Sequence, residues 1–209
     1  MKTNITKKLF FGTYQYKIAL VCVFSRAFKV HSLNNCKELI NTVVPYRLSR
    51  MDNNGAALDY ALEQDVSKKL VKCLLKMSDY KIRIEHAYIN IYTNNKKDIT
   101  TISKIDKLRI RYIAIPPDNI ILEADSLISN MPYDYRITLT RTVQDCQAFV
   151  QWADASSKVK LTKGTALALS SPNSNGGTYF YITGDNMLLM AKMHLGGYIS
   201  RIERLIKLE

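Results

Sequence analysis

The sequence predicts an α+β fold of two tandem ferredoxin-like units, each with the order βαββαβ, and a helical insertion in the first unit. The first indication is a repeated heptapeptide, YQYKIAL at residues 14–20 and YDYRITL at residues 133–139. The second is that three further segments match in the same order after each heptapeptide. The third is alternation of apolar side chains in some segments and helical spacing in others. Together these observations indicate an internal duplication.

The first unit is expected at residues 1–115. In its heptapeptide the large apolar side chains take alternate positions, which is the period of a strand. The elements that follow are a helix at 34–40, strands at 80–86 and 89–94, a helix at 97–105 and a closing strand at 108–115. An insertion at residues 45–79 is expected to hold one more helix, at 58–77. Apolar residues recur in it at helical spacing: Leu62, Val66, Leu70, Cys73, Leu74 and Met77.

The second unit is expected at residues 133–209, after a linker at residues 116–132. Its helix at 144–150 contains Cys146, which aligns with Cys36 of the first unit. The remaining elements are strands at 158–162 and 179–184, a helix at 187–195 and a closing strand at 198–208. Gly196 and Gly197 follow the last helix, where glycine commonly ends a helix.

The charge of the chain predicts a polyanionic partner. Among 209 residues, 30 are Lys or Arg and 18 are Asp or Glu, which gives a net charge of +12 and a pI near 9.5. Such a balance is typical of proteins that bind nucleic acid or an anionic membrane surface. The longest apolar run near the N-terminus, residues 18–24, is too short to span a bilayer, so no membrane partner is expected.

The four cysteines do not predict a metal or cofactor site. Cys22, Cys36, Cys73 and Cys146 form no CxxC pair and no zinc-type cluster with histidine. We therefore expect free, mostly buried thiols, no cofactor and no metal. A reduced compartment follows from this, either the cytoplasm, including that of a phage-infected cell, or a virion.

Alternation also predicts which strand residues lie on the sheet face opposite the helices. Ile18 and Leu20 must face the core, so Lys17 points the other way. The same argument gives a basic and aromatic face in each unit. Its members are Lys17, Lys81, Arg83, Tyr88, Tyr92, Arg109 and Arg111 in the first unit, and Arg136, Lys158, Lys160, Phe180 and Arg201 in the second. Cations neutralise phosphates and aromatic planes stack on unpaired bases, so these faces, or the cleft between the units, are the expected nucleic-acid site.

A catalytic site is only weakly indicated. His31 follows a strand and precedes a helix, where a general base could act on a ribose hydroxyl. A basic protein of two ferredoxin-like units is similar to the Cas6-type CRISPR RNA endonucleases, and that resemblance implies metal-independent RNA cleavage. Of their Gly-rich loop before the last strand, the chain has only HLGGY at 194–198. TGDN at 183–186 resembles the turn of palm-type polymerases but lacks the second strand carboxylate that two metals need.

The sequence therefore favours non-enzymatic binding of single-stranded RNA or DNA. One alternative is a phage structural or assembly protein that contacts the genome or an acidic partner, including a homo-oligomer. The other is an RNA endonuclease that uses His31.

Overall fold

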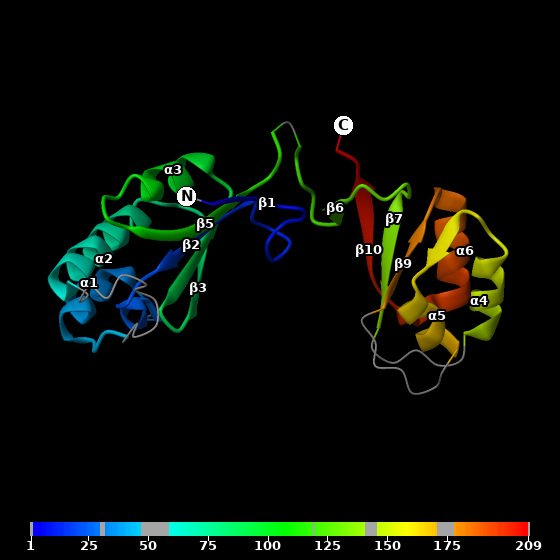
Figure 1. Cartoon of the computed structure of the whole chain (residues 1–209), viewed down its shortest axis with the longest axis horizontal. Coiled ribbons are helices and arrows are strands. Elements are labelled where there is room, and N and C mark those ends of the chain that lie inside the picture. The colour runs from blue at the N-terminus through cyan, green and yellow to red at the C-terminus, as the bar shows by residue number, and fades with distance from the viewer. Residues whose placement is uncertain are drawn as a thin grey trace. The chain divides into compact units, whose positions relative to one another are not determined.

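The computed structural model describes residues 2–29, 32–46, 59–118, 120–140, 146–170 and 178–208 (Figure 1). The predicted α+β class is confirmed: the described part contains two five-stranded sheets and six α-helices. The chain divides into two compact units, Met1–Leu122 and Glu123–Glu209. The division falls inside the segment that the sequence assigns to a linker, 116–132.

The first sheet has the strand order β1-β5-β2-β4-β3. Its strands are β1 (Thr3–Ile5), β2 (Tyr16–Val21), β3 (Tyr80–Glu85), β4 (Tyr88–Thr93) and β5 (Arg109–Ile115). β1 lies parallel to β5, whereas the other neighbours are antiparallel. β4 (YINIYT) consists mostly of β-branched and aromatic residues, which favour a pleated strand between two neighbours.

Three helices cover one face of this sheet: α1 (Leu33–Thr42), α2 (Tyr60–Leu74) and α3 (Lys96–Ser103) (Figure 1). α2 begins at Asp59, whose carboxylate accepts hydrogen bonds from the amides of Ala61 and Leu62 at 3.0 and 3.1 Å. A 3₁₀ helix, Ser25–Lys29, links β2 to the residues before α1. The core includes these fully buried side chains: Ile18, Leu20, Ile89, Ile91, Ile40, Leu70, Leu74 and Ile102.

The second sheet has the order β6-β10-β7-β9-β8. Its strands are β6 (Ser126–Ile128), β7 (Tyr135–Leu139), β8 (Val159–Leu161), β9 (Tyr179–Ile182) and β10 (Ile199–Ile206). The helices α4 (Gln147–Asp154), α5 (Lys163–Ser170) and α6 (Asp185–Leu195) contribute Phe149, Leu169 and Ala191 to one core with this sheet. β6 is parallel to β10, as β1 is to β5.

Three short elements were not predicted from the sequence. They are the edge strands β1 and β6, and the helix α5. β6 lies within the expected linker, where it pairs with the last strand of the second unit. The helix expected at 58–77 is α2, which ends at Leu74, and residues 47–58 lie outside the described part.

Candidate functional site

The side chains opposite α1, α2 and α3 form a face that we name the first open face. Lys17 lies on it between Tyr92 of β4 and Ala114 of β5, and Lys81 lies opposite Tyr92 on the other side. The members of this face that concern function are Lys17, Lys81, Arg83, Tyr88, Tyr92, Arg111 and Tyr112. The face is rich in cations and aromatic rings.

Lys17 lies at the centre of this face. Its Nζ donates a hydrogen bond to Tyr112 Oη at 2.5 Å, and lies 5.0 Å and 5.5 Å from the ring centroids of Tyr112 and Tyr92. In the described part of the chain, no carboxylate forms an ion pair with Lys17. Neither the Tyr112 hydroxyl nor the Tyr92 ring is an anion, so the Lys17 ammonium has no counter-ion among the described residues.

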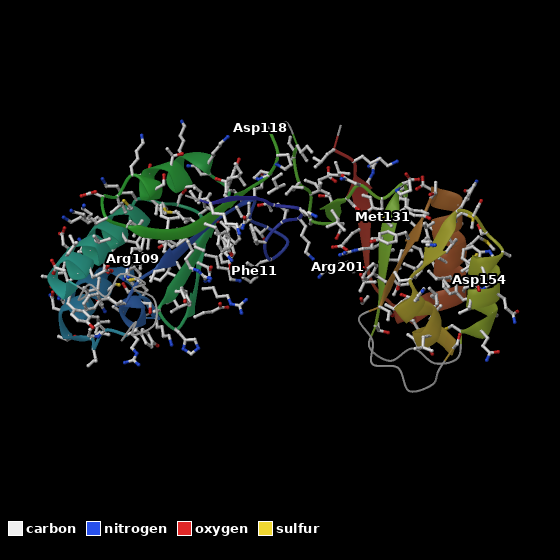
Figure 2. The ribbon with its side chains drawn as sticks, in the orientation of Figure 1. Phe11, Arg109, Asp118, Met131, Asp154 and Arg201 are labelled. Carbon is white, nitrogen blue, oxygen red and sulfur yellow. The ribbon has the colours of Figure 1, made fainter. Side chains whose placement is uncertain are left out.

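The loop between β1 and β2, residues 6–15, folds onto one end of this face. Phe10 and Phe11 pack on Tyr92, with ring centroids 5.3 and 4.9 Å away, and Lys81 Nζ lies 4.0 Å from the Phe11 ring. Tyr92 is only 4% exposed, whereas Phe11, which is labelled in Figure 2, is 50% exposed. Tyr92 is therefore largely covered, and Phe11 is the most exposed of these three rings.

The backbone of this loop turns sharply at Phe11 and Gly12, which have φ of 55° and 70°. The amide of Phe10 donates to the carbonyl of Tyr14 at 2.8 Å and closes the turn. A left-handed conformation is uncommon for a large aromatic residue and often occurs at binding sites. The sequence reasoning missed both phenylalanines, although KKLFFG at residues 7–12 is basic and aromatic enough to have indicated a ligand-binding loop.

The other end of the first open face holds Arg111 and Tyr88. The Arg111 guanidinium lies 4.3 Å from the centre of the Tyr88 ring. The register of β2 and β5 shifts beside Arg111, which stays exposed. Arg83 is also exposed, and it pairs with Glu85 on its own strand at 2.8 Å.

Arg109, another residue predicted for the first open face, has its guanidinium paired with a carboxylate. Its Nε lies 3.0 Å from Glu63 Oε1 on α2, which covers the opposite face (Figure 2). Arg109 is the first residue of β5 and pairs with Val21, and its guanidinium is bound to Glu63 rather than presented to a ligand. Its charge is balanced within the fold.

The corresponding face of the second sheet, which we name the second open face, has a carboxylate at its centre. Arg136 Nε donates to Glu203 Oε2 at 2.8 Å, and Arg201 Nη1 lies 3.7 Å from Glu203 Oε1. Glu203 is only 2% exposed, although it lies on this face. One buried carboxylate therefore neutralises part of the charge of two arginines.

Phe180 was predicted on the second open face, and that prediction was wrong. It is fully buried in the core, 5.2 Å from the ring of Phe149. Its neighbours Tyr179 and Tyr181 take the open positions, because a shift of one residue moves a strand side chain to the other face. Lys160 lies opposite Tyr181, and Lys158 precedes β8; both lysines are exposed.

The catalytic and metal candidates have different outcomes. His31, the one catalytic candidate, lies outside the described part. No group of three or more His, Cys, Asp or Glu side chains in the described ranges could hold a metal. In the TGDN turn, Gly184 N donates to Asp134 Oδ2 at 2.8 Å and Asp185 accepts from Tyr135 Oη at 2.5 Å. These two carboxylates therefore make structural hydrogen bonds at the start of α6, and the Asp185 carboxylate raises the pKa of Tyr135.

Comparisons with known proteins do not assign the chain. No family model matches it, and neither the curated proteins nor the solved structures include a significant match. Within the described ranges, the helices lack the length and apolar character that crossing a membrane requires.

Proposed function

We propose that this protein binds single-stranded nucleic acid on the first open face, without catalysing a reaction. The observation on which this depends is that Lys17, Lys81 and Arg111 each lie against an aromatic ring and form no ion pair with a carboxylate in the described part. Three such cations on one sheet face can neutralise the phosphates of a strand. The overall charge of +12 supports the same partner.

Base stacking in this proposal uses Phe11 and Tyr112, since Tyr92 is covered. Exposed aromatic rings among cations bind single strands with little sequence preference, because every base has a stacking face. A duplex hides those faces, so we expect single strands to bind more tightly than duplexes. RNA and DNA both satisfy this chemistry.

We also propose that the two units are ferredoxin-like duplicates with different tasks. The described strands and helices support this: without β1 and β6, the orders β5-β2-β4-β3 and β10-β7-β9-β8 both correspond to fourth-first-third-second along the unit. Lys17 and Arg136 are equivalent in the repeat, but Lys17 faces Ala114 where Arg136 faces Glu203. The absence of a carboxylate opposite Lys17 on β5 favours the first unit as the binding unit.

The test is a titration of fluorescein-labelled single- and double-stranded RNA and DNA by anisotropy, from 50 to 300 mM salt. If three phosphates of a single strand are neutralised, the logarithm of the binding constant should fall with the logarithm of the salt concentration with a slope near 2, at about 0.7 per phosphate. The variant K17M/K81M/R111M should lose that slope and bind at least tenfold more weakly. The control K69M/K72M/K104M removes the same charge from α2 and the end of α3, and should bind nearly as the unchanged protein does. Equal loss in both variants would show that only net charge matters.

A second function is favoured by the outer side of α6. Leu189 and Met193 are 59% and 73% exposed, and Leu167 of α5 is also exposed. Exposed apolar side chains close together on a helix favour protein contacts, so the second unit could bind a protein partner in an assembly. L189K/M193K should then abolish self-association in sedimentation runs without nucleic acid. A protein that stays monomeric before and after the change contradicts homo-oligomeric assembly.

A further inference from the structure

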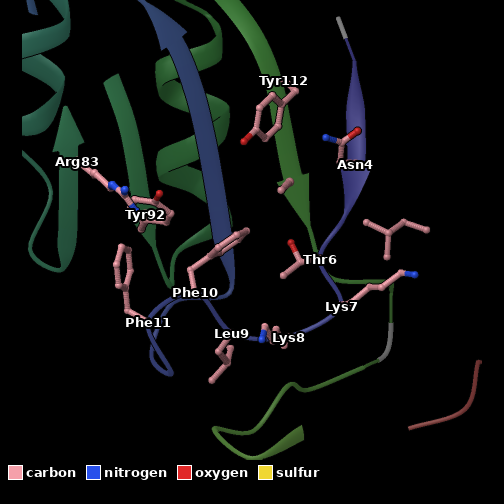
Figure 3. Close-up of a pocket in the computed structure, with 12 residues that line it drawn as sticks. Asn4, Thr6, Lys7, Lys8, Leu9, Phe10, Phe11, Arg83, Tyr92 and Tyr112 are labelled. Atoms are coloured by element: carbon pink, nitrogen blue, oxygen red, sulfur yellow. The ribbon is translucent and has the colours of Figure 1, made fainter. Parts of the chain in front are cut away.

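A cavity of about 520 Å³ lies between the β1–β2 loop and the first open face (Figure 3). Phe10, Tyr92 and Tyr112 form aromatic walls, and Thr6 and Asn4 contribute polar groups. The volume is within the range of small-molecule sites, which combine mainly apolar walls with a few polar groups. This cavity belongs entirely to the first unit.

Thr6 contributes a buried hydroxyl to the cavity. Its side chain is 3% exposed, and its Oγ1 has no hydrogen-bond partner among the described residues. The backbone amide of Thr6 donates to Ile115 O at 2.7 Å, so the residue is held next to β5. In Figure 3 the side chain points toward Phe10, into the lined space. Buried hydroxyls are nearly always paired, so an unpaired one that lines a cavity marks a position where a ligand could form a hydrogen bond.

Tyr112 offers a second polar atom. Its Oη accepts the hydrogen bond from Lys17, which leaves its own O–H as a donor. A planar ligand beside Phe10 could therefore meet a hydroxyl on each of two sides. The edge of a nucleobase, with alternating donors and acceptors, fits this arrangement, whereas an aliphatic chain would leave Thr6 unpaired.

Cations surround the aromatic walls. Lys7 and Arg83 line the same cavity and are exposed to solvent, and Lys17 lies behind Tyr112 and Tyr92. A ligand that combines a flat ring with an anionic group would place the ring between the aromatic side chains and the anion at Lys7. A nucleotide has both parts.

We propose that this cavity binds one nucleotide, with its base between Phe10 and Tyr112 and its phosphate at Lys7. This inference deepens the proposed function, since the nucleotide is taken to belong to the strand on the first open face. A free mononucleotide has the same chemistry, so the experiment includes both sources. The base would form a hydrogen bond with the Thr6 hydroxyl, which no group in the described part of the chain does.

The test uses the full chain and T6V, a change that keeps the shape of the side chain and removes its hydroxyl. Short single-stranded oligonucleotides are titrated by anisotropy, and the four ribonucleoside monophosphates by calorimetry. We expect T6V to weaken binding roughly tenfold, the effect of one lost hydrogen bond, without lowering the melting temperature of the free protein. T3V, on the exposed part of β1, is the control and should bind as the unchanged protein does.

The outcomes separate the two proposals. Oligonucleotides that bind the unchanged protein and T6V equally overturn the cavity inference but leave nucleic-acid binding intact. A second outcome is that monophosphates bind, that T6V weakens their binding, and that oligonucleotides do not bind. This outcome supports the cavity inference and overturns the single-strand proposal. If neither ligand binds at 50 mM salt, both proposals are wrong.

Discussion

The guanidinium of Arg136 pairs with the carboxylate of Glu203 across β7 and β10, with Nε and Oε2 2.8 Å apart. At the equivalent place in the first unit, Lys17 faces Ala114 across β2 and β5. The two sheets have the same strand order, but the cations at equivalent positions have different cross-strand neighbours. In one unit the charge is paired with a buried carboxylate, and in the other it stays available.

Glu203→Gln should destabilise the second unit. The change leaves Arg136 without its anionic partner, and a lost hydrogen bond to a charged group costs about 1–3 kcal/mol. Urea unfolding followed by fluorescence measures the effect, because Trp152, the single tryptophan, belongs to the core of this unit. Glu85→Gln in the exposed Arg83 pair is the control and should change stability by less than about 0.5 kcal/mol. Equal effects of both variants would contradict a structural role for Glu203.

Lys17→Met should weaken binding of single strands and lower the salt slope by about 0.7, the contribution of one phosphate contact. The double variant R136Q/E203Q removes a neutral pair, so it should keep the slope of the unchanged protein. Anisotropy titrations at four salt concentrations measure both slopes. If R136Q/E203Q lowers the slope and Lys17→Met does not, the second open face is the binding surface.

The sequence could predict the elements with strong periodicity. The repeated heptapeptides and the apolar spacing locate β2, β7, α2 and the hairpin of β3 and β4 to within a few residues. The three-residue strands β1 and β6 are too short for a period to show, and their pairing with β5 and β10 is long-range. α5 (KGTALALS) contains Gly164 and Thr165, which favour a helix weakly.

The candidate site was harder to predict because it depends on tertiary contacts. Alternation gives the face of Lys17 but not the loop that brings Phe10 and Phe11 onto Tyr92. Alternation also does not predict that Glu203 is buried and forms an ion pair with Arg136. Phe180 shows how an error of one residue in strand register converts a core side chain into a supposed ligand contact.

Gly184→Ala should destabilise the second unit by about 1–3 kcal/mol. Gly184 has φ of 87° and ψ of 148° just before α6, a conformation that side chains with a Cβ avoid. No atom of the described residues lies within 4 Å of the new Cβ, so the expected cost is in the backbone conformation. Gly164→Ala is the matched control within α5, where alanine should be neutral or stabilise by up to about 1 kcal/mol. Trp152 fluorescence during urea unfolding reports both, and a stable Gly184→Ala variant would contradict the argument.

Two buried thiols should make the first unit less stable at alkaline pH. Burial raises the pKa of Cys22 from 9.0 to about 11 and that of Cys36 from 9.0 to about 12. The folded pKa values are raised, so their stabilising effect is complete below pH 9 and is lost as the pH rises toward 11 and 12. Between these limits the unfolded chain has released protons that the folded chain still holds, and the free energy of unfolding falls.

Lysines and tyrosines also titrate in this pH range. The contribution of the thiols is therefore the difference in the slope of unfolding free energy against pH between the unchanged protein and a variant without them. Near pH 10.5 the two thiols should contribute a fall of about 2 kcal/mol per pH unit, since each proton difference is worth about 1.4 kcal/mol per unit. C22A/C36A should be less stable at pH 8, because the buried sulfur atoms are lost, but its stability should decline less steeply above pH 9. Urea unfolding followed by far-UV circular dichroism, under reducing conditions from pH 8 to 11, gives both slopes. Parallel curves for the two proteins would mean that these thiols ionise as readily in the folded chain as in the unfolded one.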